Sequence, residues 1–269
     1  MSIGPMSPEA LRRYIQTHHE KQYLLVDVRQ PEEYRRGHIP GARLIPLPEL
    51  VKDMDQLPAD KELVFYCQVG GRSMAAAAMV EEEGWGGAIH NLSGGLMAWD
   101  GGQVADLPRV RLFEGQSVQE MFRTAMDLEK GAQIFYETVG ARHAEQFWGP
   151  IFARLAKAEW AHAKAVHGFW QQVQPDLESF EPLFEAMPGE ILEGGIPLQQ
   201  ALEKLADPGD DTFLRLIELA LQIEYAAFDL YRTLADQHRD SAIQEAFTSL
   251  AQSEKAHMQS LIEAMAKHN

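Results

Sequence analysis

Four residues in the C-terminal part of the chain recur 95 positions later, and most of them are of types that bind metal ions. The repeated set is Glu129, Tyr136, Glu159 and His162, followed by Glu224, Tyr231, Glu254 and His257. In each copy a lone glutamate precedes a Glu-x-x-His by 30 residues. Carboxylate oxygen and imidazole nitrogen, without thiolate, are the ligands of non-haem di-iron or di-manganese centres. Two copies within a four-helix bundle would supply the six ligands of a carboxylate-bridged metal pair.

The spacing within each copy places the candidate ligands on common helix faces. Residues three apart lie on one side of a helix, so Glu159 and His162 can both face the axis of a bundle. The lone glutamates, Glu129 and Glu224, are then placed to bridge or cap the metals. Apolar residues recur at the same offset, which predicts a duplicated helix hairpin with these charges on core-facing surfaces. Because an unpaired charge there would be costly, a buried network of charges and hydrogen bonds without metal is the alternative interpretation.

Tyr136 and Tyr231 follow the lone glutamates by seven residues and lie on the same helix faces. Their hydroxyl groups can donate hydrogen bonds to metal ligands and so orient them. An ordinary role in an amphipathic core is the alternative.

Four long helical stretches must position these residues. They are Ser117–Val139, His143–Val173, Thr212–Asp236 and Asp240–Lys267. A capping box at Ser117 starts the first helix, Gly140 is placed to end it, and Pro150 predicts that the second helix starts or kinks there. The segment from Gln174 to Asp211 is too long for a hairpin turn. It predicts a crossover between two antiparallel helix pairs, with a short helix near Pro197–Ala206.

The single cysteine, Cys67, directly follows a predicted buried strand and precedes a predicted helix. The loop between them contains Gln68, Val69, Gly70, Gly71 and Arg72. A thiol at the carboxyl end of such a strand lies in the usual ligand crevice of an α/β sheet. Loop N–H groups and the helix dipole favour an anion there, and cysteines in such settings have pKa values lowered to roughly 3.5–7.5. Arg72 would add a positive charge at the rim; an inert buried cysteine is the alternative.

The first hundred residues alternate short apolar runs with short amphipathic segments, which predicts a mainly parallel sheet covered on both faces. The predicted strands are Tyr23–Val28, Ala42–Ile45, Glu62–Tyr66 and Ala88–Leu92. The predicted helices are Pro8–His18, Pro31–Arg36, Leu47–Gln56, Ser73–Glu83 and Gly95–Asp100. The fold class is therefore multidomain α/β plus all-α. An α/β domain covers residues 1–103, a linker covers 104–116, and a four-helix bundle covers 117–269.

Length and charge limit the function classes. A chain of 269 residues can form two domains with separate cores. The net charge of −16 argues against nucleic acid or an anionic membrane as a partner. Neither the segment from Met1 to Tyr14 nor any later run has the apolar length of a signal peptide or a membrane span. With one cysteine the chain can form no internal disulfide, and the expected location is the cytoplasm.

Three segments of the first domain carry a resemblance to a known family. They are Leu25-Val26-Asp27-Val28-Arg29 with Glu33-Tyr34 and Gly37-His38-Ile39-Pro40-Gly41-Ala42, the loop from Cys67 to Arg72, and Gly94-Gly95-x-x-Ala98-Trp99. Together they resemble a single-domain rhodanese. The resemblance implies a sulfurtransferase in which Cys67 takes sulfane sulfur from a small-molecule donor, holds it as a persulfide, and passes it to an acceptor. A phosphatase of this fold has five residues between cysteine and arginine, whereas this loop has four, which favours sulfur.

Other residues of these segments have structural interpretations. Asp27 and Arg29 are predicted to form a structural ion pair and cap; an electrostatic contribution to the site is the alternative. His38 and Trp99 are predicted to be packing residues.

Residues 117–269 resemble the ferritin-like domain of rubrerythrins. The match covers the long middle connection and six ligand positions, Glu129, Glu159, His162, Glu224, Glu254 and His257. Two features depart from the family: Ala227 stands where a further glutamate is typical, and one cysteine cannot build the rubredoxin-like four-cysteine iron site. The resemblance implies two iron ions per chain (manganese or zinc being possible) that reduce peroxide or dioxygen with an external electron donor. It also implies a homodimer, because such bundles commonly pair. The alternative function is a non-catalytic metal-binding module joined to a sulfur carrier or sensor.

Overall fold

The computed structural model describes residues 3–52, 54–204, 212–238 and 240–268. They divide into two compact units, Met1–Leu107 and Pro108–Asn269, and each unit has its own hydrophobic core. Within the described ranges, no helix combines the length and apolar content needed to cross a bilayer. The two units are described separately below.

The first unit is built on a parallel sheet. Over its described residues the strand order is β1-β5-β4-β2-β3. The strands are β1 (Gly4–Met6), β2 (Tyr23–Asp27), β3 (Arg43–Leu44), β4 (Glu62–Tyr66) and β5 (Ile89–Leu92). Strand β1 was not predicted, because it has only three residues and a central proline. As an edge strand, β1 tolerates that proline because one side of its backbone needs no partner.

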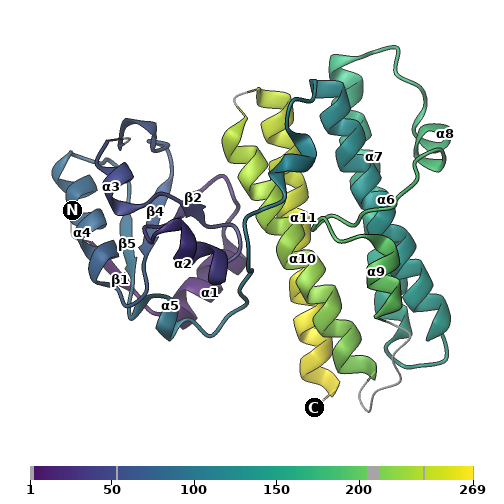
Figure 1. The fold of residues 1–269 in the computed structure, drawn as a ribbon, viewed down its shortest axis with the longest axis horizontal. Helices are drawn as coiled ribbons and strands as arrows, with labels where there is room; N and C mark the ends of the chain where they lie inside the picture. Colours follow the sequence, from purple (N-terminus) through teal and green to yellow (C-terminus); the bar gives the residue numbers. More distant parts are fainter. Residues whose placement is uncertain (1–2, 53, 205–211, 239, 269) are drawn as a thin grey trace. The chain divides into compact units, whose positions relative to one another are not determined.

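Helices cover both faces of this sheet (Figure 1), as predicted. They are α1 (Pro8–Thr17), α2 (Pro31–Arg36), α3 (Leu47–Leu50), α4 (Gly71–Glu82) and α5 (Gly95–Ala98). Side chains alternate between faces along a strand, so in β4 Leu63 and Phe65 join the core beneath α3 and α4. Val64 and Tyr66 join the core beneath α1, α2 and α5. Strand β4 is thereby buried on both sides, and this burial fixes the position of Cys67, the residue that follows the strand.

Two predicted helices of this unit are shorter than expected. The stretch Leu47–Gln56 forms α3 and a separate 3-10 turn, η1 (Met54–Gln56), with residue 53 outside the described ranges. The amphipathic pattern does not continue past Leu50, because Val51 is 51% exposed. Helix α5 ends at Ala98, since Trp99 adopts an extended backbone and its indole N–H donates to the Gly102 carbonyl at 3.0 Å.

The residues predicted as a linker, 104–116, are folded into both units. Val104 exchanges two backbone hydrogen bonds with His38 of the first unit, at 2.9 and 3.0 Å. Val110–Phe113 forms a 3-10 helix, η2, in the second unit, and the Phe113 ring packs edge-on against Phe247 at 5.5 Å. Both ends of the predicted linker thus make contacts within a unit, Val104 in the first and Phe113 in the second.

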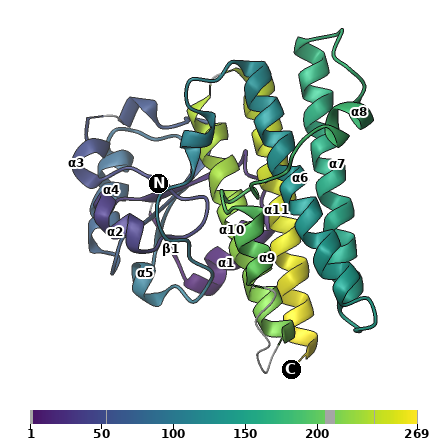
Figure 2. The same ribbon diagram turned by 45° about the vertical axis from the view of Figure 1, so that its right-hand side comes forward.

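The second unit is a bundle of four long helices, which lie side by side in Figures 1 and 2. They are α6 (Val118–Arg142), α7 (Gly149–Val173), α10 (Thr212–Gln237) and α11 (Ser241–His268). Ser117 caps α6 as predicted, in a capping box with Glu120. Helix α6 runs past Gly140, whose lack of a side chain allows close packing against Ala153 of α7. Helix α7 begins at Gly149, with Pro150 in its first turn.

The crossover between α7 and α10 carries two short helices. Helix α9 (Leu198–Glu203) lies within the predicted stretch Pro197–Ala206, whose last two residues fall outside the described ranges. Helix α8 (Phe180–Glu185) was not predicted. It forms because Phe180, Leu183 and Phe184 share one buried face.

Candidate functional site

Cys67 lies at the carboxyl end of β4, directly before the turn that starts α4. Its Sγ atom accepts a hydrogen bond from the Gly70 N–H at 3.1 Å and one from the Ser73 hydroxyl at 3.5 Å. Gly70 has φ of 101°, in the left-handed region, which turns its N–H toward the sulfur. The thiol is therefore held in a cradle of donors at a helix N-terminus.

This cradle lowers the pKa of the Cys67 thiol. Burial by itself raises that pKa, because it disfavours the charged thiolate. The hydrogen bonds from Ser73, Val69 and Gly70 more than offset burial. The geometry thus favours the thiolate, which is the nucleophilic form of cysteine.

The N-terminus of α5 packs against the backbone of the cysteine loop. The Leu96 N–H donates to the Cys67 carbonyl at 2.8 Å, and the Met97 N–H donates to the Gln68 carbonyl at 3.0 Å. A Cβ atom on Gly95 would lie 2.3 Å from the Cys67 carbonyl oxygen. This close approach explains Gly95, and the two hydrogen bonds hold the loop against α5.

Arg72 lies on the first turn of α4 and forms a two-pronged ion pair with Glu33 of α2. Its two terminal nitrogens lie 2.7 Å from the two Glu33 oxygens. Hydrogen bonding to Glu33 raises the pKa of Arg72, whereas burial lowers it. Attraction to Glu33 and to Cys67 adds to the rise, so the pKa of Arg72 lies above its usual value. This role of Glu33 was not predicted from the sequence, although its place beside Tyr34 in the first motif was a signal.

The Glu33–Arg72 pair gives a testable pH dependence. Hydrogen bonding to Arg72 lowers the pKa of Glu33 from 4.5 to about 2. A lowered carboxyl pKa stabilises the fold above the unfolded value, and the contribution is lost as pH falls from about 4.5 toward 2. We expect Glu33→Gln to remove this pH-dependent part, about 0.2–1 kcal/mol for a half-exposed pair. Urea unfolding at pH 7 and at pH 3 measures it; an equal pH dependence in the variant and the wild type would contradict it.

The Asp27–Arg29 pair is buried and holds the cysteine loop from the other side. Arg29 binds Asp27 at 2.7 Å, and its guanidinium also donates to the Gln68 side chain at 3.2 Å. This is a structural ion pair, as expected, with an added link to the loop. The His38 ring stacks on Tyr34 at 3.6 Å between ring centres, as its predicted packing role requires.

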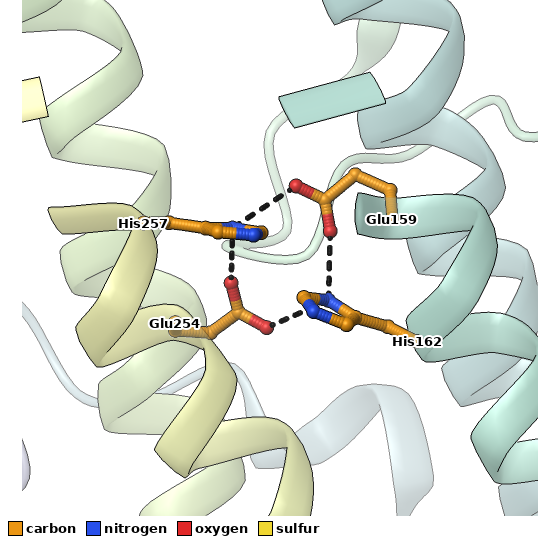
Figure 3. A group of neighbouring side chains, drawn as sticks. All are labelled: Glu159, His162, Glu254 and His257. Carbon is orange, nitrogen blue, oxygen red and sulfur yellow. Dashed lines mark ion pairs between the residues drawn. The ribbon is translucent and has the colours of Figure 1, made fainter. Parts of the chain in front are cut away.

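In the second unit, the six predicted ligand residues converge inside the bundle. Figure 3 shows four of them in a closed ring, in which Glu159 and Glu254 each face both imidazoles. These four side chains offer ligand atoms that all lie within 4.8 Å of one another. The predicted carboxylates Glu129, Glu159, Glu224 and Glu254 are fully buried.

The arrangement follows the sequence repeat. His162 Nδ1 lies 3.3 Å from Glu129, 3.0 Å from Glu159 and 3.5 Å from Glu254. His257 Nδ1 makes the equivalent set of contacts, at 3.1 Å to Glu224, 3.1 Å to Glu254 and 3.2 Å to Glu159. The two rings stack at 4.8 Å between centres. The two hairpins therefore meet at an approximate twofold axis that passes between the imidazoles.

The repeated tyrosines link one hairpin to the other. Tyr231 of α10 donates to Glu129 of α6 at 2.6 Å, and Tyr136 of α6 donates to Glu224 of α10. Both tyrosines are fully buried in the core. Each tyrosine thus fixes the orientation of the lone glutamate of the other hairpin. It also packs in the core, so the hydrogen-bonding role and the core role considered from sequence both apply.

The buried charges strongly shift one another. Burial would lower the pKa of His162, but attraction to Glu254, Glu129 and Glu159 raises it to about 11. Burial raises the pKa of Glu254 well above its usual range, against the attraction of the two imidazoles. In the absence of metal, the surrounding carboxylates thus favour the charged form of the imidazole.

The donor set fits a pair of metal ions. Both oxygens of Glu159 and of Glu254, and one oxygen of Glu129, accept no hydrogen bond of normal geometry from the described residues. Buried oxygens without donors are costly, and oxygen with imidazole nitrogen suits iron or manganese. One member of this cluster, Glu193, was not predicted; it offers a carboxylate oxygen within 4.8 Å of oxygens of Glu129, Glu159 and Glu254. Nothing in the repeat pointed to it, because it lies in the crossover.

Comparison with known proteins identifies both parts of the chain. Residues 7–101 match the model of the rhodanese-like domain, and residues 215–269 match the model of rubrerythrin. The second match includes Glu224, Glu254 and His257; the first hairpin is related to it by the internal repeat.

Individual relatives match the rhodanese type. The Bacillus subtilis protein YtwF is 38% identical over 101 residues, covering 38% of this chain and 94% of YtwF. A sulfurtransferase of Allochromatium vinosum is 41% identical over 76 residues, covering 28% of this chain and 70% of that protein. The crystal structure of a rhodanese-like domain protein from Staphylococcus aureus is 28% identical, with a TM-score of 0.35, covering 39% of this chain and 99% of that one.

The fold and the two clusters thus define a fusion of a parallel α/β domain with a ferritin-like helix bundle. The chain belongs to the rhodanese-like family through its first domain and carries a rubrerythrin domain at its C-terminal end. These matches support sulfur transfer in the first unit and a di-iron module in the second.

Proposed function

We propose that the first unit transfers sulfane sulfur through a persulfide on Cys67. The observation that carries the proposal is the cradle of N–H and hydroxyl donors around Sγ, which stabilises an anionic sulfur. The same donors stabilise the terminal sulfur of a persulfide, which is also an anion. Arg72, held by Glu33, places a cation at the rim for an anionic donor.

With thiosulfate as donor, the step is a sulfur-to-sulfur displacement. The Cys67 thiolate attacks the outer sulfur, a new S–S bond forms, and the bond within thiosulfate breaks to release sulfite with its electron pair. A nucleophilic acceptor such as cyanide or a thiolate then attacks the terminal sulfur and restores the Cys67 thiolate. The two steps balance without an added oxidant.

The test is direct detection of the persulfide. Wild-type protein incubated with thiosulfate should gain the mass of one sulfur atom, and peptide mapping should place it on Cys67. Added cyanide should remove it. Mass that stays unchanged with thiosulfate and with a low-molecular-weight persulfide would overturn the proposal.

For the second unit, we propose a two-iron centre held by Glu129, Glu159, His162, Glu224, Glu254 and His257, with manganese or zinc as substitutes. Iron bound there would supply the chemistry for reducing peroxide or dioxygen with electrons from an external donor. The residues themselves orient the carboxylates and exclude water, since the carboxylates are fully buried. Support comes from the paired ligand set and from its buried oxygens that accept no hydrogen bond from the described residues.

A second candidate is a metal-binding module without turnover, next to a sulfur carrier or sensor. It is favoured by Ala227, where the family has a glutamate, and by the single cysteine, which cannot build a four-cysteine iron site. Anaerobic loading with Fe(II) should give about two ions per chain. Peroxide consumption by the loaded protein with a reducing partner then separates the candidates: turnover supports the enzyme, and its failure supports the binding module.

A further inference from the structure

Glu193 is a buried carboxylate that the crossover inserts among the candidate metal ligands. It lies in a tight turn closed by hydrogen bonds from the Leu192 N–H to the Ile196 carbonyl, at 2.8 Å, and from the Leu198 N–H to the Glu190 carbonyl, also 2.8 Å. The side chain is fully buried, although the segment around it belongs to no long helix. A turn of this kind normally lies on a protein surface, so its position within the bundle requires an explanation.

Small residues on two helices make room for this turn. A Cβ atom on Gly131 of α6 would lie 2.2 Å from the Ile191 carbonyl oxygen. A Cβ atom on Gly194 would lie 2.6 Å from the Ala226 Cβ of α10. Gly131 and Ala226 are separated by the 95 positions of the internal repeat. Equivalent positions of the two hairpins are therefore small and contact the turn from both sides.

The approach is also fixed by a polar contact. The Asp127 side chain of α6 accepts a hydrogen bond from the Gly189 N–H at 2.9 Å. The Asp127–Gly189 hydrogen bond thus holds the crossover just before the turn, and the backbone hydrogen bonds described above hold the turn itself. Glu193 is placed by a rigid frame, which precise ligand positioning requires.

The Glu193 carboxyl has no partner among the described residues that would explain its burial. Neither oxygen accepts a hydrogen bond from the part of the chain that the structure describes. Its neighbours in the cluster are the carboxylates Glu129, Glu159 and Glu254. An apolar residue would be more stable at this position in the metal-free protein, so the carboxylate points to a cationic ligand.

Helix α10 lacks the carboxylate that the rubrerythrin resemblance would place at Ala227, and Ala227 is fully buried. We infer that Glu193, delivered by the crossover between Gly131 and Ala226, is a further ligand of the metal pair and takes the place of that helix carboxylate. The inference rests on the proposed metal centre. It makes the donor set five carboxylates and two imidazoles, supplied by four helices and one turn.

The test compares Glu193→Gln with Glu190→Gln, an exposed position in the same crossover. Binding of Mn(II) and, anaerobically, of Fe(II) is measured by titration, and thermal unfolding is measured on the metal-free proteins. We expect Glu193→Gln to weaken metal binding at least about tenfold while leaving the metal-free protein equally or more stable. Glu190→Gln should match the wild type in both.

Each other outcome has a defined meaning. Equal metal affinity in Glu193→Gln and wild type overturns the inference and leaves the metal centre standing. Lower metal-free stability with equal affinity also overturns it, because it identifies a structural residue. Wild-type protein that binds neither Mn(II) nor Fe(II) overturns the metal centre and the inference with it. A crystal structure of the Mn(II)-loaded wild type, with anomalous scattering, tests the assignment without a variant: a Glu193 oxygen bound to metal supports it, and one turned away refutes it.

Discussion

Replacing Cys67 by serine is expected to abolish sulfur uptake from thiosulfate and from small persulfides. The serine hydroxyl can accept the hydrogen bonds that Gly70 and Ser73 give to the sulfur, so the loop should keep its shape. The hydroxyl is not ionised near neutral pH and cannot form a persulfide. Thiocyanate formation from thiosulfate and cyanide should therefore fall to the rate without protein.

The matched control is Met79→Ser, on the exposed side of α4 and away from the loop. It introduces the same residue type and should retain the wild-type rate. A Cys67→Ser protein that is folded, by circular dichroism, and still forms thiocyanate at the wild-type rate would show that the thiol does not carry the sulfur.

The double change His162→Ala with His257→Ala should remove most bound metal and also destabilise the metal-free bundle. Each imidazole contacts three buried carboxylates. Removing one partner of a buried ion pair costs about 3–5 kcal/mol, because the remaining charge is left uncompensated. Elemental analysis after dialysis should show well under the two ions expected for the wild type. Denaturant unfolding of the metal-free proteins measures the second effect.

His143→Ala is the control, because His143 lies in the same unit but packs against Trp148 outside the cluster. Its metal content should equal that of the wild type. Metal content that stays at the wild-type level in the double variant would refute the ligand assignment. Metal loss without any change in metal-free stability would instead refute the ion-pair network.

Much of this architecture could be predicted from sequence because its signals are local or repeated. The alternation in β4 and the Glu-x-x-His spacing each specify a face, and the offset of 95 residues ties the two hairpins together. Strand β1 could not be predicted, because three residues that include a proline show no hydrophobic period. The end of α3 could not be predicted, because the hydrophobic pattern alone does not show which apolar residues remain exposed.

The least predictable residues of the site are those whose positions depend on how segments distant in sequence pack together. Glu193 has no repeat partner and no helical spacing, and its burial results from contacts with helices that are distant in sequence. The pairing of Glu33 with Arg72 spans 39 positions and likewise depends on how α2 and α4 pack. The positions of such residues are determined by tertiary packing, which sequence periodicity does not reveal.

The crossed tyrosine contacts have a consequence for how this bundle can be divided. Each lone glutamate is oriented by a hydroxyl from the opposite half, so one half alone holds its carboxylate without the group that aims it. A fragment with a single half could rebuild the centre only by associating with a second identical fragment. The four long helices therefore resemble an approximately symmetric dimer of hairpins joined in one polypeptide.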